Sequence, residues 1–143
     1  MTDTGQAGAV LRSPAARIDA VGVVVSEMAA AVRFYERLGC TFPAGAAQED
    51  HAEADLGGVR LMLDDQAMLV QIGFFDADAA KASYGRVAFA ARLGTAAEVD
   101  ALYAALAADG FGVREPFDAP WGQRYATVAD PDGTHVDLYA ATS

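Results

Sequence analysis

Two histidines each stand two residues before a carboxylate, and these pairs are the residues best suited to metal binding or proton transfer. His51 precedes Glu53, and His135 precedes Asp137. Residues two apart in a strand point to the same face, and both pairs lie in segments of alternating pattern. Imidazole and carboxylate groups can ligate a divalent ion or act as a general base. No tight ligand spacing supports a metal site, and isolated histidines on half-exposed strands are mostly surface residues.

The sequence contains no pattern typical of a cysteine-based, nucleophilic or phosphate-binding catalytic site. Cys40 is the only cysteine, which excludes an internal disulfide and a zinc site built from cysteines, and we expect it to be a small buried apolar residue. No nucleophile stands beside a base, and no glycine-rich phosphate loop is present. A catalytic base would have to be His135 or Asp137.

Composition and charge narrow the class of partner. The chain has 143 residues, of which 53% are hydrophobic, and its net charge is −10. The negative charge argues against nucleic acid and anionic membranes, and it tolerates a cationic small molecule. No apolar run reaches the roughly 18 residues of a membrane span, and residues 1–16 resemble a loose tail and not a signal peptide. We therefore expect a cytoplasmic protein.

The same order of predicted secondary-structure elements occurs twice in the chain and positions these residues. Residues 18–42 and 85–113 each predict a strand, a helix that begins after Ser26 or Thr95, a glycine that ends the helix, and a second short strand. Residues 51–56 and 59–64 predict two further strands in the first half, joined at Gly57–Gly58. We interpret residues 66–83 as a link between the halves, with 69–75 extended.

The second half closes with a hairpin. Residues 123–129 and 134–139 predict strands that the sequence DPDG at 130–133 joins in a turn. In the first strand of each half the larger side chains alternate with small ones. The small ones are Ala20 and Gly22 in one half and Ala88 and Ala90 in the other. Because a helix should cover the larger side chains, the small ones predict a hollow on the opposite face of each sheet.

Three segments together resemble the vicinal oxygen chelate superfamily, which includes glyoxalase I, bleomycin-resistance proteins and extradiol dioxygenases. They are SEMAAAVRFYERLG (26–39), GGVRLML (57–63) and PWGQRYATVADPDGTHVDLYA (120–140). The resemblance covers residues 17–140 and is nearest to the bleomycin-resistance branch. It implies an α+β fold of two tandem βαβββ modules, here 17–65 and 84–143, with helices on the outer face of a cupped mixed sheet. It also implies a homodimer.

The resemblance also assigns the four metal-ligand positions of the superfamily. They correspond here to Ala20, Met62, Arg86 and Asp137. Ala20 has no donor atom, the Met62 thioether is too soft for the usual ions, and the Arg86 cation has no lone pair to donate. Only Asp137 could still be a ligand, so we expect no metal and no other cofactor. A rebuilt set that uses His135, Asp137 and another carboxylate is the alternative.

The same positions can hold a ligand in place of a metal. In this superfamily the first and last strands of a module are neighbours, so Arg86 and Asp137 should pair. They either neutralise each other or bind polar groups of a ligand. Trp121 resembles a loop residue that stacks on flat or cationic ligand groups in bleomycin-resistance proteins. Its alternative role is to anchor the loop by packing on the sheet. The predicted ligand-binding residues are Arg86, Asp137, Trp121, Met62, Tyr139 and His135.

Three functions fit this pattern. The first is a metal-free protein that sequesters an aromatic or cationic drug or metabolite. The second is a lyase, isomerase or dioxygenase, either with a rebuilt metal site or without a metal. The third is a dimeric regulatory or scaffold protein. A chelator would inactivate a metal-dependent enzyme, whereas a binding protein would not respond.

Overall fold

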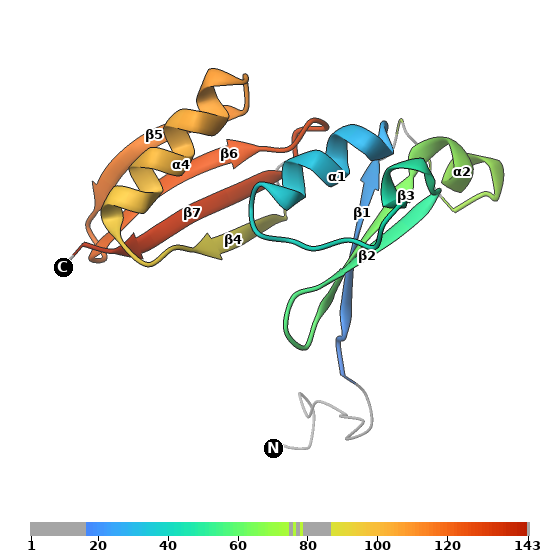
Figure 1. Cartoon of the computed structure of the whole chain (residues 1–143), viewed down its shortest axis with the longest axis horizontal. Coiled ribbons are helices and arrows are strands. Elements are labelled where there is room, and N and C mark those ends of the chain that lie inside the picture. Colours follow the sequence, from blue (N-terminus) through green and yellow to red (C-terminus); the bar gives the residue numbers. More distant parts are fainter. Residues whose placement is uncertain (1–16, 75, 77, 79–86, 143) are drawn as a thin grey trace, which may run out of the picture.

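Two mixed β-sheets, each with a helix against one face, form the described part of the chain (Figure 1). The computed structural model describes residues 17–74, 76, 78 and 87–142. The predicted tail, residues 1–16, and Arg86 lie outside the described residues. The elements are β1 (Ala20–Val25), α1 (Met28–Glu36), the 3₁₀ helix η1 (Ala46–Gln48), β2 (His51–Asp55), β3 (Arg60–Asp65), α2 (Gln66–Gln71), β4 (Ala88–Arg92), α4 (Ala96–Ala108), β5 (Gly112–Ala119), β6 (Gln123–Ala129) and β7 (His135–Ala141).

The strand order confirms the predicted α+β class and is consistent with two tandem βαβββ modules. Sheet A has the order β1-β3-β2, and sheet B has the order β4-β7-β6-β5. In both sheets the first strand lies parallel to the last strand of its module, β1 beside β3 and β4 beside β7. The hairpin β6–β7 is antiparallel, as the DPDG turn predicts.

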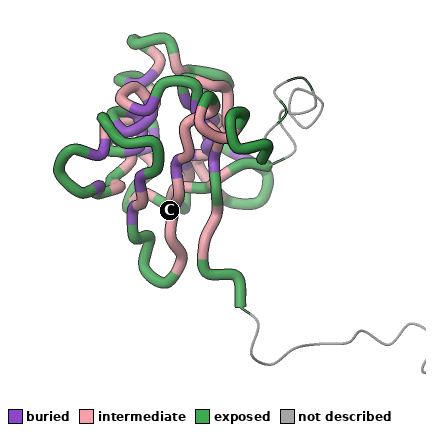
Figure 2. The backbone as a smooth tube through the Cα atoms, turned by 90° about the vertical axis from the view of Figure 1, so that its right-hand side faces the viewer, coloured by how far each residue is buried: buried purple, intermediate pink, exposed green. Residues whose placement is uncertain are grey.

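Alternation along the strands decides which face each helix covers. In β1 and β3 the buried residues are Val23, Val25, Leu61 and Leu63, and α1 contacts β3. In sheet B, α4 packs on β5, β6 and β7, where the buried residues include Ala126, Val128, Val136, Leu138 and Ala140. Helices α1 and α4 leave the opposite face of their sheets uncovered, and this face is called here the open face. In Figure 2 the buried stretches follow the strands and helices, while most connecting loops are exposed.

The two modules share one hydrophobic core through α1. The ring of Phe34 meets Phe111 edge-on at 5.1 Å between centroids, and Tyr35 meets Phe89 at 6.2 Å. The Tyr35 hydroxyl also donates to the buried Asp130 carboxylate, with 2.8 Å between oxygens. Burial raises the pKa of Asp130. The same carboxylate accepts hydrogen bonds from the backbone N–H of Asp132 and Thr134, so one side chain holds the turn and joins the modules.

The start of the first helix differs from the prediction. The N-cap is Glu27, whose side chain accepts a hydrogen bond from the Ala30 backbone N–H at 2.8 Å. The backbone N–H of Ser26 instead donates to Asp132 in the other module. In the second helix the predicted cap Thr95 is confirmed, and its side chain forms a capping box with Glu98.

The predicted short strand after Gly39 is wrong. Residues 41–45 form a loop that leads into η1, so sheet A has three strands where sheet B has four. Pro43 cannot donate to a strand ladder, and Gly45 has a φ of +83°, which turns the chain away from an extended course. Phe42 and Ala46 are buried on either side of this turn. In the second module the strand predicted after Gly110 is present as β5.

The extended structure predicted for residues 69–75 is also wrong at residues 69–74, and residue 75 lies outside the described residues. Residues 66–71 form α2, and the Asp65 side chain caps this helix by accepting a hydrogen bond from the Met68 N–H at 3.1 Å. Gly73, with a φ of +80°, follows the last turn. Helix α2 contacts β3 of the first module.

Candidate functional site

The open face of sheet B places a carboxylate among hydroxyl groups. Asp137 lies on β7, and the register of the hairpin sets it opposite Thr127 of β6. One carboxylate oxygen accepts a hydrogen bond from the Tyr125 hydroxyl at 2.7 Å, and the other accepts one from the Thr127 hydroxyl at 2.8 Å. Each oxygen has two lone pairs, so both can still accept from a ligand.

The hydrogen bond between Tyr125 and Asp137 favours a neutral tyrosine, with the carboxylate as the hydrogen-bond acceptor. The hydrogen bond to Asp137, with a smaller contribution from burial, raises the pKa of Tyr125 to about 12. Tyr125 therefore stays protonated at neutral pH, and its hydroxyl donates a hydrogen bond to Asp137. The half-buried Asp137 carboxylate is thereby fixed in orientation by two donors on the neighbouring strand.

Four aromatic rings contact one another next to this carboxylate, which they reach through Tyr125, and are called here the aromatic wall: Phe117, Trp121, Tyr125 and Tyr139. Tyr125 stacks on Tyr139 with 6.4 Å between centroids and meets Trp121 edge-on at 5.4 Å. The Trp121 indole N–H donates to the Gln123 side chain at 2.9 Å, which holds the ring in place while 59% of the residue remains exposed. An exposed indole fixed in this way offers a flat surface to a ligand.

Local irregularity in β5 brings the fourth ring to the wall. The β5–β6 register shifts between Arg114 and Phe117, where Pro116 lacks an N–H for the ladder. After the shift Phe117 lies opposite Tyr125. Two guanidinium groups also lie over the wall, Arg92 at 6.0 Å from the Tyr139 centroid and Arg114 at 5.3 Å from that of Phe117.

The open face of sheet A carries a chain of charged groups instead. The His51 ring lies between two carboxylates, with Nδ1 at 2.6 Å from Asp64 and Nε2 at 2.7 Å from Glu53. The other Glu53 oxygen accepts a hydrogen bond from Arg60 at 2.8 Å. The hydrogen bonds to Asp64 and then to Glu53 raise the pKa of His51, since both ring nitrogens donate only when the imidazole is protonated.

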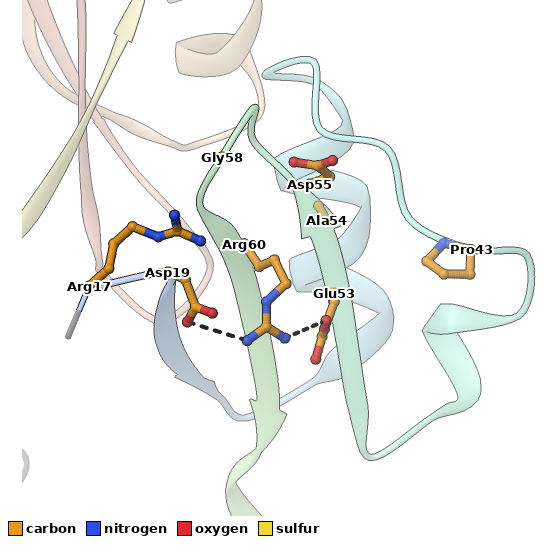
Figure 3. Close-up of a pocket in the computed structure, with 8 residues that line it drawn as sticks. All are labelled: Arg17, Asp19, Pro43, Glu53, Ala54, Asp55, Gly58 and Arg60. Atoms are coloured by element: carbon orange, nitrogen blue, oxygen red, sulfur yellow. Dashed lines mark hydrogen bonds and ion pairs between the residues drawn. The ribbon is translucent and has the colours of Figure 1, made fainter. Parts of the chain in front are cut away.

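A hollow of about 500 Å³ opens near the end of the β2–β3 hairpin (Figure 3). Arg60 points between Asp19 and Glu53, with nitrogen-to-oxygen distances of 3.6 Å and 2.8 Å. Arg17 and Asp55 also line this hollow. Arg60 pairs with two of its three carboxylates, Asp19 and Glu53, and its described lining includes no aromatic ring. The sheet B face therefore offers the better combination of apolar surface and polar anchor.

The residues at the implied metal positions do not fit a metal. Ala20 and Met62 lie on the open face of sheet A and supply no donor or only a thioether, and Arg86 lies outside the described residues. Asp137 is engaged by two hydroxyl donors. Within residues 17–74, 76, 78 and 87–142, no three side chains of histidine, cysteine, aspartate or glutamate are grouped to hold an ion. The rebuilt set around His135 and Asp137 is thus not assembled among the described residues.

The structure brings only part of the predicted site together. Asp137, Tyr139 and Trp121 meet through Tyr125 on sheet B. His135 lies further along β7, opposite Ala129 of β6. Met62 lies in sheet A, opposite Gly22. The expected pairing of Arg86 with Asp137 falls outside the described residues, and Ala90 is the β4 residue opposite Asp137.

Sequence reasoning did not assign roles to Thr127, Phe117 and Arg92, and it left the facing of Tyr125 open. The sequence did contain a signal for the facing of Thr127 and Tyr125. Counting outward from the turn at 130–133 pairs residue 129 with 135, and so Thr127 with Asp137 and Tyr125 with Tyr139. Phe117 had no such signal, because a register shift precedes it.

None of the helices in the described ranges has the length and apolar character that crossing a bilayer requires.

Comparisons with known proteins agree with this architecture. The model of the Glyoxalase/Bleomycin resistance protein/Dioxygenase superfamily matches residues 17–138. No curated protein matches the sequence. A solved glyoxalase/bleomycin resistance protein/dioxygenase from Nocardioides is similar at 26% identity and a TM-score of 0.69, covering 97% of this chain and 91% of that one.

Two further solved structures are similar in fold. A glyoxalase-related enzyme from Fulvimarina pelagi shares 22% identity at a TM-score of 0.70, covering 87% of each chain. Lactoylglutathione lyase from Agrobacterium tumefaciens shares 21% identity at a TM-score of 0.59, covering 90% of this chain and 96% of that one. At these identities the likeness establishes the fold alone.

Proposed function

We propose that this chain, which belongs to the Glyoxalase/Bleomycin resistance protein/Dioxygenase superfamily, is a metal-free binding protein for a small aromatic or cationic molecule. The ligand lies on the open face of sheet B. One observation carries this proposal: the Asp137 carboxylate is fixed by Tyr125 and Thr127 beside an aromatic wall to which Tyr125 belongs. Sequestration requires an apolar surface with a few polar anchors and no catalyst.

The aromatic wall and the carboxylate have separate roles. A flat ligand gains affinity by stacking on the exposed Trp121 ring, and an amine or hydroxyl group on it donates to Asp137 and sets its orientation. Arg92 lies over Tyr139, two residues along β4 from Ala90, and moderates the negative potential of Asp137. The net charge of −10 still favours cationic over anionic ligands at long range.

We also propose that the protein is a cytoplasmic homodimer that binds neither nucleic acid nor membranes. The first strand of each module, β1 or β4, forms an edge of its sheet. Ile18 lies two residues before β1 and Val87 one residue before β4, and they are 81% and 68% exposed. Exposed strand edges flanked by apolar side chains favour pairing with a second copy. Light scattering on the full chain should give twice the monomer mass, and a monomer at micromolar concentration would contradict the dimer.

The binding function can be tested by calorimetric titration with proflavine, a planar aromatic cation. The protein is first treated with a chelator, which should leave the affinity unchanged. Trp121→Ala should weaken binding by about 2- to 30-fold, because it removes one stacking and cation–π surface. Val113→Ala is the matched control, since Val113 is an exposed apolar residue that belongs to neither the wall nor the carboxylate group.

Each outcome bears on a different part of the proposal. Loss of binding after chelation would contradict a metal-free site. Equal affinities for Trp121→Ala and Val113→Ala would contradict the aromatic wall. Tetramethylammonium serves as a cation without rings, and tighter binding of it than of proflavine would also contradict the wall.

A further inference from the structure

Arg92 brings a cation to the same face of sheet B as Asp137. In the parallel pair β4–β7, Arg92 lies opposite Tyr139 (Figure 1). Ala90, two residues earlier, lies opposite Asp137. Opposite residues of paired strands project to one face, and the Arg92 guanidinium does lie over the Tyr139 ring. The cation and the carboxylate are therefore diagonal neighbours on the open face. Pairing of the β4 edge with a second copy would use backbone groups and leave this guanidinium over the face.

The two charges do not neutralise each other. Among the residues that the structure describes, Arg92 forms no ion pair and contacts the Tyr139 ring instead. Asp137 accepts hydrogen bonds from two hydroxyl groups and from no described cation. A step of one strand across and two residues along separates Cα atoms by about 8 Å, which leaves room for a group between the charges. The guanidinium keeps its donors, and the carboxylate keeps lone pairs, for a ligand.

The floor beside these charges is made of small side chains. Ala90 and Ala88 lie on this face of β4 and are exposed. A methyl group rises little above a sheet, so the head of a ligand can lie there without displacing a larger side chain. On its other side Asp137 has Thr127 as its neighbour, and the Thr127 hydroxyl already donates to the carboxylate. The more open approach to Asp137 is therefore from β4.

The aromatic wall begins next to the same two charges. Tyr139 stacks on Tyr125, which meets Trp121 edge-on. The Tyr125 hydroxyl binds Asp137, and Tyr139 lies under the Arg92 guanidinium. A ligand ring that lies on this wall is therefore beside a cation and an anion at once.

From this arrangement, and resting on the proposed function, we infer that the ligand is an aromatic zwitterion with the head group of an α-amino acid. Its ammonium group donates to Asp137, its carboxylate accepts from Arg92, and its ring lies on the aromatic wall. Asp137 alone would accept any cation, and Arg92 narrows the class to molecules that carry both charges. The net charge of −10 repels an anion at long range but not a zwitterion.

Three compounds with one indole ring separate the two charges in titration calorimetry: L-tryptophan, tryptamine and indole-3-propionate. They carry both charges, the ammonium alone and the carboxylate alone, on the same ring and chain. Tryptophan should bind about 3- to 30-fold tighter than tryptamine, because it adds a charge-assisted contact to an exposed guanidinium. Indole-3-propionate should bind more weakly than tryptamine. L-Alanine, a zwitterion without a ring, should bind more weakly than tryptophan.

Three arginine variants locate the group that binds the carboxylate. Arg92→Gln should abolish the preference for tryptophan over tryptamine without weakening tryptamine, since it removes a cation that repels the amine. Arg114→Gln removes the other guanidinium over the wall and should retain the preference. Arg33→Gln is the control for net charge, because Arg33 lies on α1 of the first module. All three side chains are exposed, so the fold should tolerate these changes.

The handedness of the ligand gives a second readout that depends on geometry. A ring, an ammonium group and a carboxylate that are each held at a separate point fit only one enantiomer. D- and L-tryptophan should therefore differ in affinity for the parent protein. The difference should disappear in Arg92→Gln, where one of the three points is lost.

The outcomes separate this inference from the proposed function. Proflavine binding without any preference for tryptophan over tryptamine, or with equal affinities for the two enantiomers, would overturn the zwitterion and leave the proposed binding site standing. Loss of the preference in Arg114→Gln or Arg33→Gln but not in Arg92→Gln would also overturn it. Failure of proflavine and of all three indoles to bind would overturn the proposed function and this inference together.

Discussion

The open faces of the two sheets are built on the same plan but carry different side chains. Sheet B presents the aromatic wall and one carboxylate held by hydroxyl groups. Sheet A presents His51, Glu53, Asp64 and Arg60, whose charges are satisfied by one another. A duplicated fold therefore does not imply a duplicated site. Asp137 of sheet B can still accept hydrogen bonds and lies beside exposed rings, so sheet B is the half suited to bind a ligand.

The largest expected effect tests whether the modules are energetically one unit. Leu138→Ala in sheet B and Leu63→Ala in sheet A each remove a fully buried side chain from the shared core. Each should lower the free energy of unfolding by about 2–5 kcal/mol. Denaturant unfolding followed by circular dichroism should show a single transition in both variants. Two separated transitions in either variant would show that the halves fold independently.

The next prediction compares the carboxylates of the two faces. Asp137→Asn should weaken proflavine binding by about 10- to 100-fold, because a charge-assisted contact is lost in sheet B. Glu53→Gln removes the same charge from sheet A and should change affinity less than twofold. Titration of both variants against the parent protein decides the matter. Equal losses would mean that only the net charge attracts the ligand.

A smaller effect is expected at the link between the modules. Tyr35→Phe removes the hydroxyl that donates to Asp130 and leaves the two backbone donors of Asp132 and Thr134 in place. Unfolding free energy should fall by about 1–3 kcal/mol, since a buried carboxylate loses a partner. Thermal denaturation measures the loss. An unchanged midpoint would show that aromatic packing of α1 alone joins the modules.

The smallest effect concerns pH and is confined to sheet A. The pKa of His51 in the folded state is raised above its ordinary value of 6.5 by Asp64 and Glu53. Its contribution to stability is therefore fully present below about pH 6.5 and is lost as pH rises through the folded pKa. His51→Gln should remove this part of the pH dependence of the melting temperature. A parent protein that gains stability relative to His51→Gln as pH rises would contradict the assignment.

The sequence predicted most of what depends on local pattern. Alternation in residues 18–25 predicted the buried face of β1, and Thr95 predicted the start of α4. The failures depend on single residues that break a strand or cap a helix and that the apolar pattern does not reveal. Residues 41–45 follow a glycine as residues 111–115 do, yet Pro43 and Gly45 redirect the chain. Asp65 begins a helix where an apolar run suggested a strand.

For the candidate site, residue types were predictable and their partners were not. Asp137, Tyr139 and Trp121 stood out by type and position, and they do meet on one face. The roles of Thr127 and Tyr125 required the register of the hairpin. The position of Phe117 required a register shift in β5, and Arg92 required the three-dimensional course of a guanidinium over a ring on the neighbouring strand. These features arise only when strands pair.

The most direct test of the central claim is fluorescence titration of the chelator-treated protein with proflavine, because Trp121 is the only tryptophan and lies in the aromatic wall. The account predicts saturable quenching of Trp121 with one proflavine per chain, at an affinity that added divalent ions do not change. Binding measured by calorimetry without quenching, or quenching that appears only after a divalent ion is restored, would contradict a metal-free ligand site on sheet B.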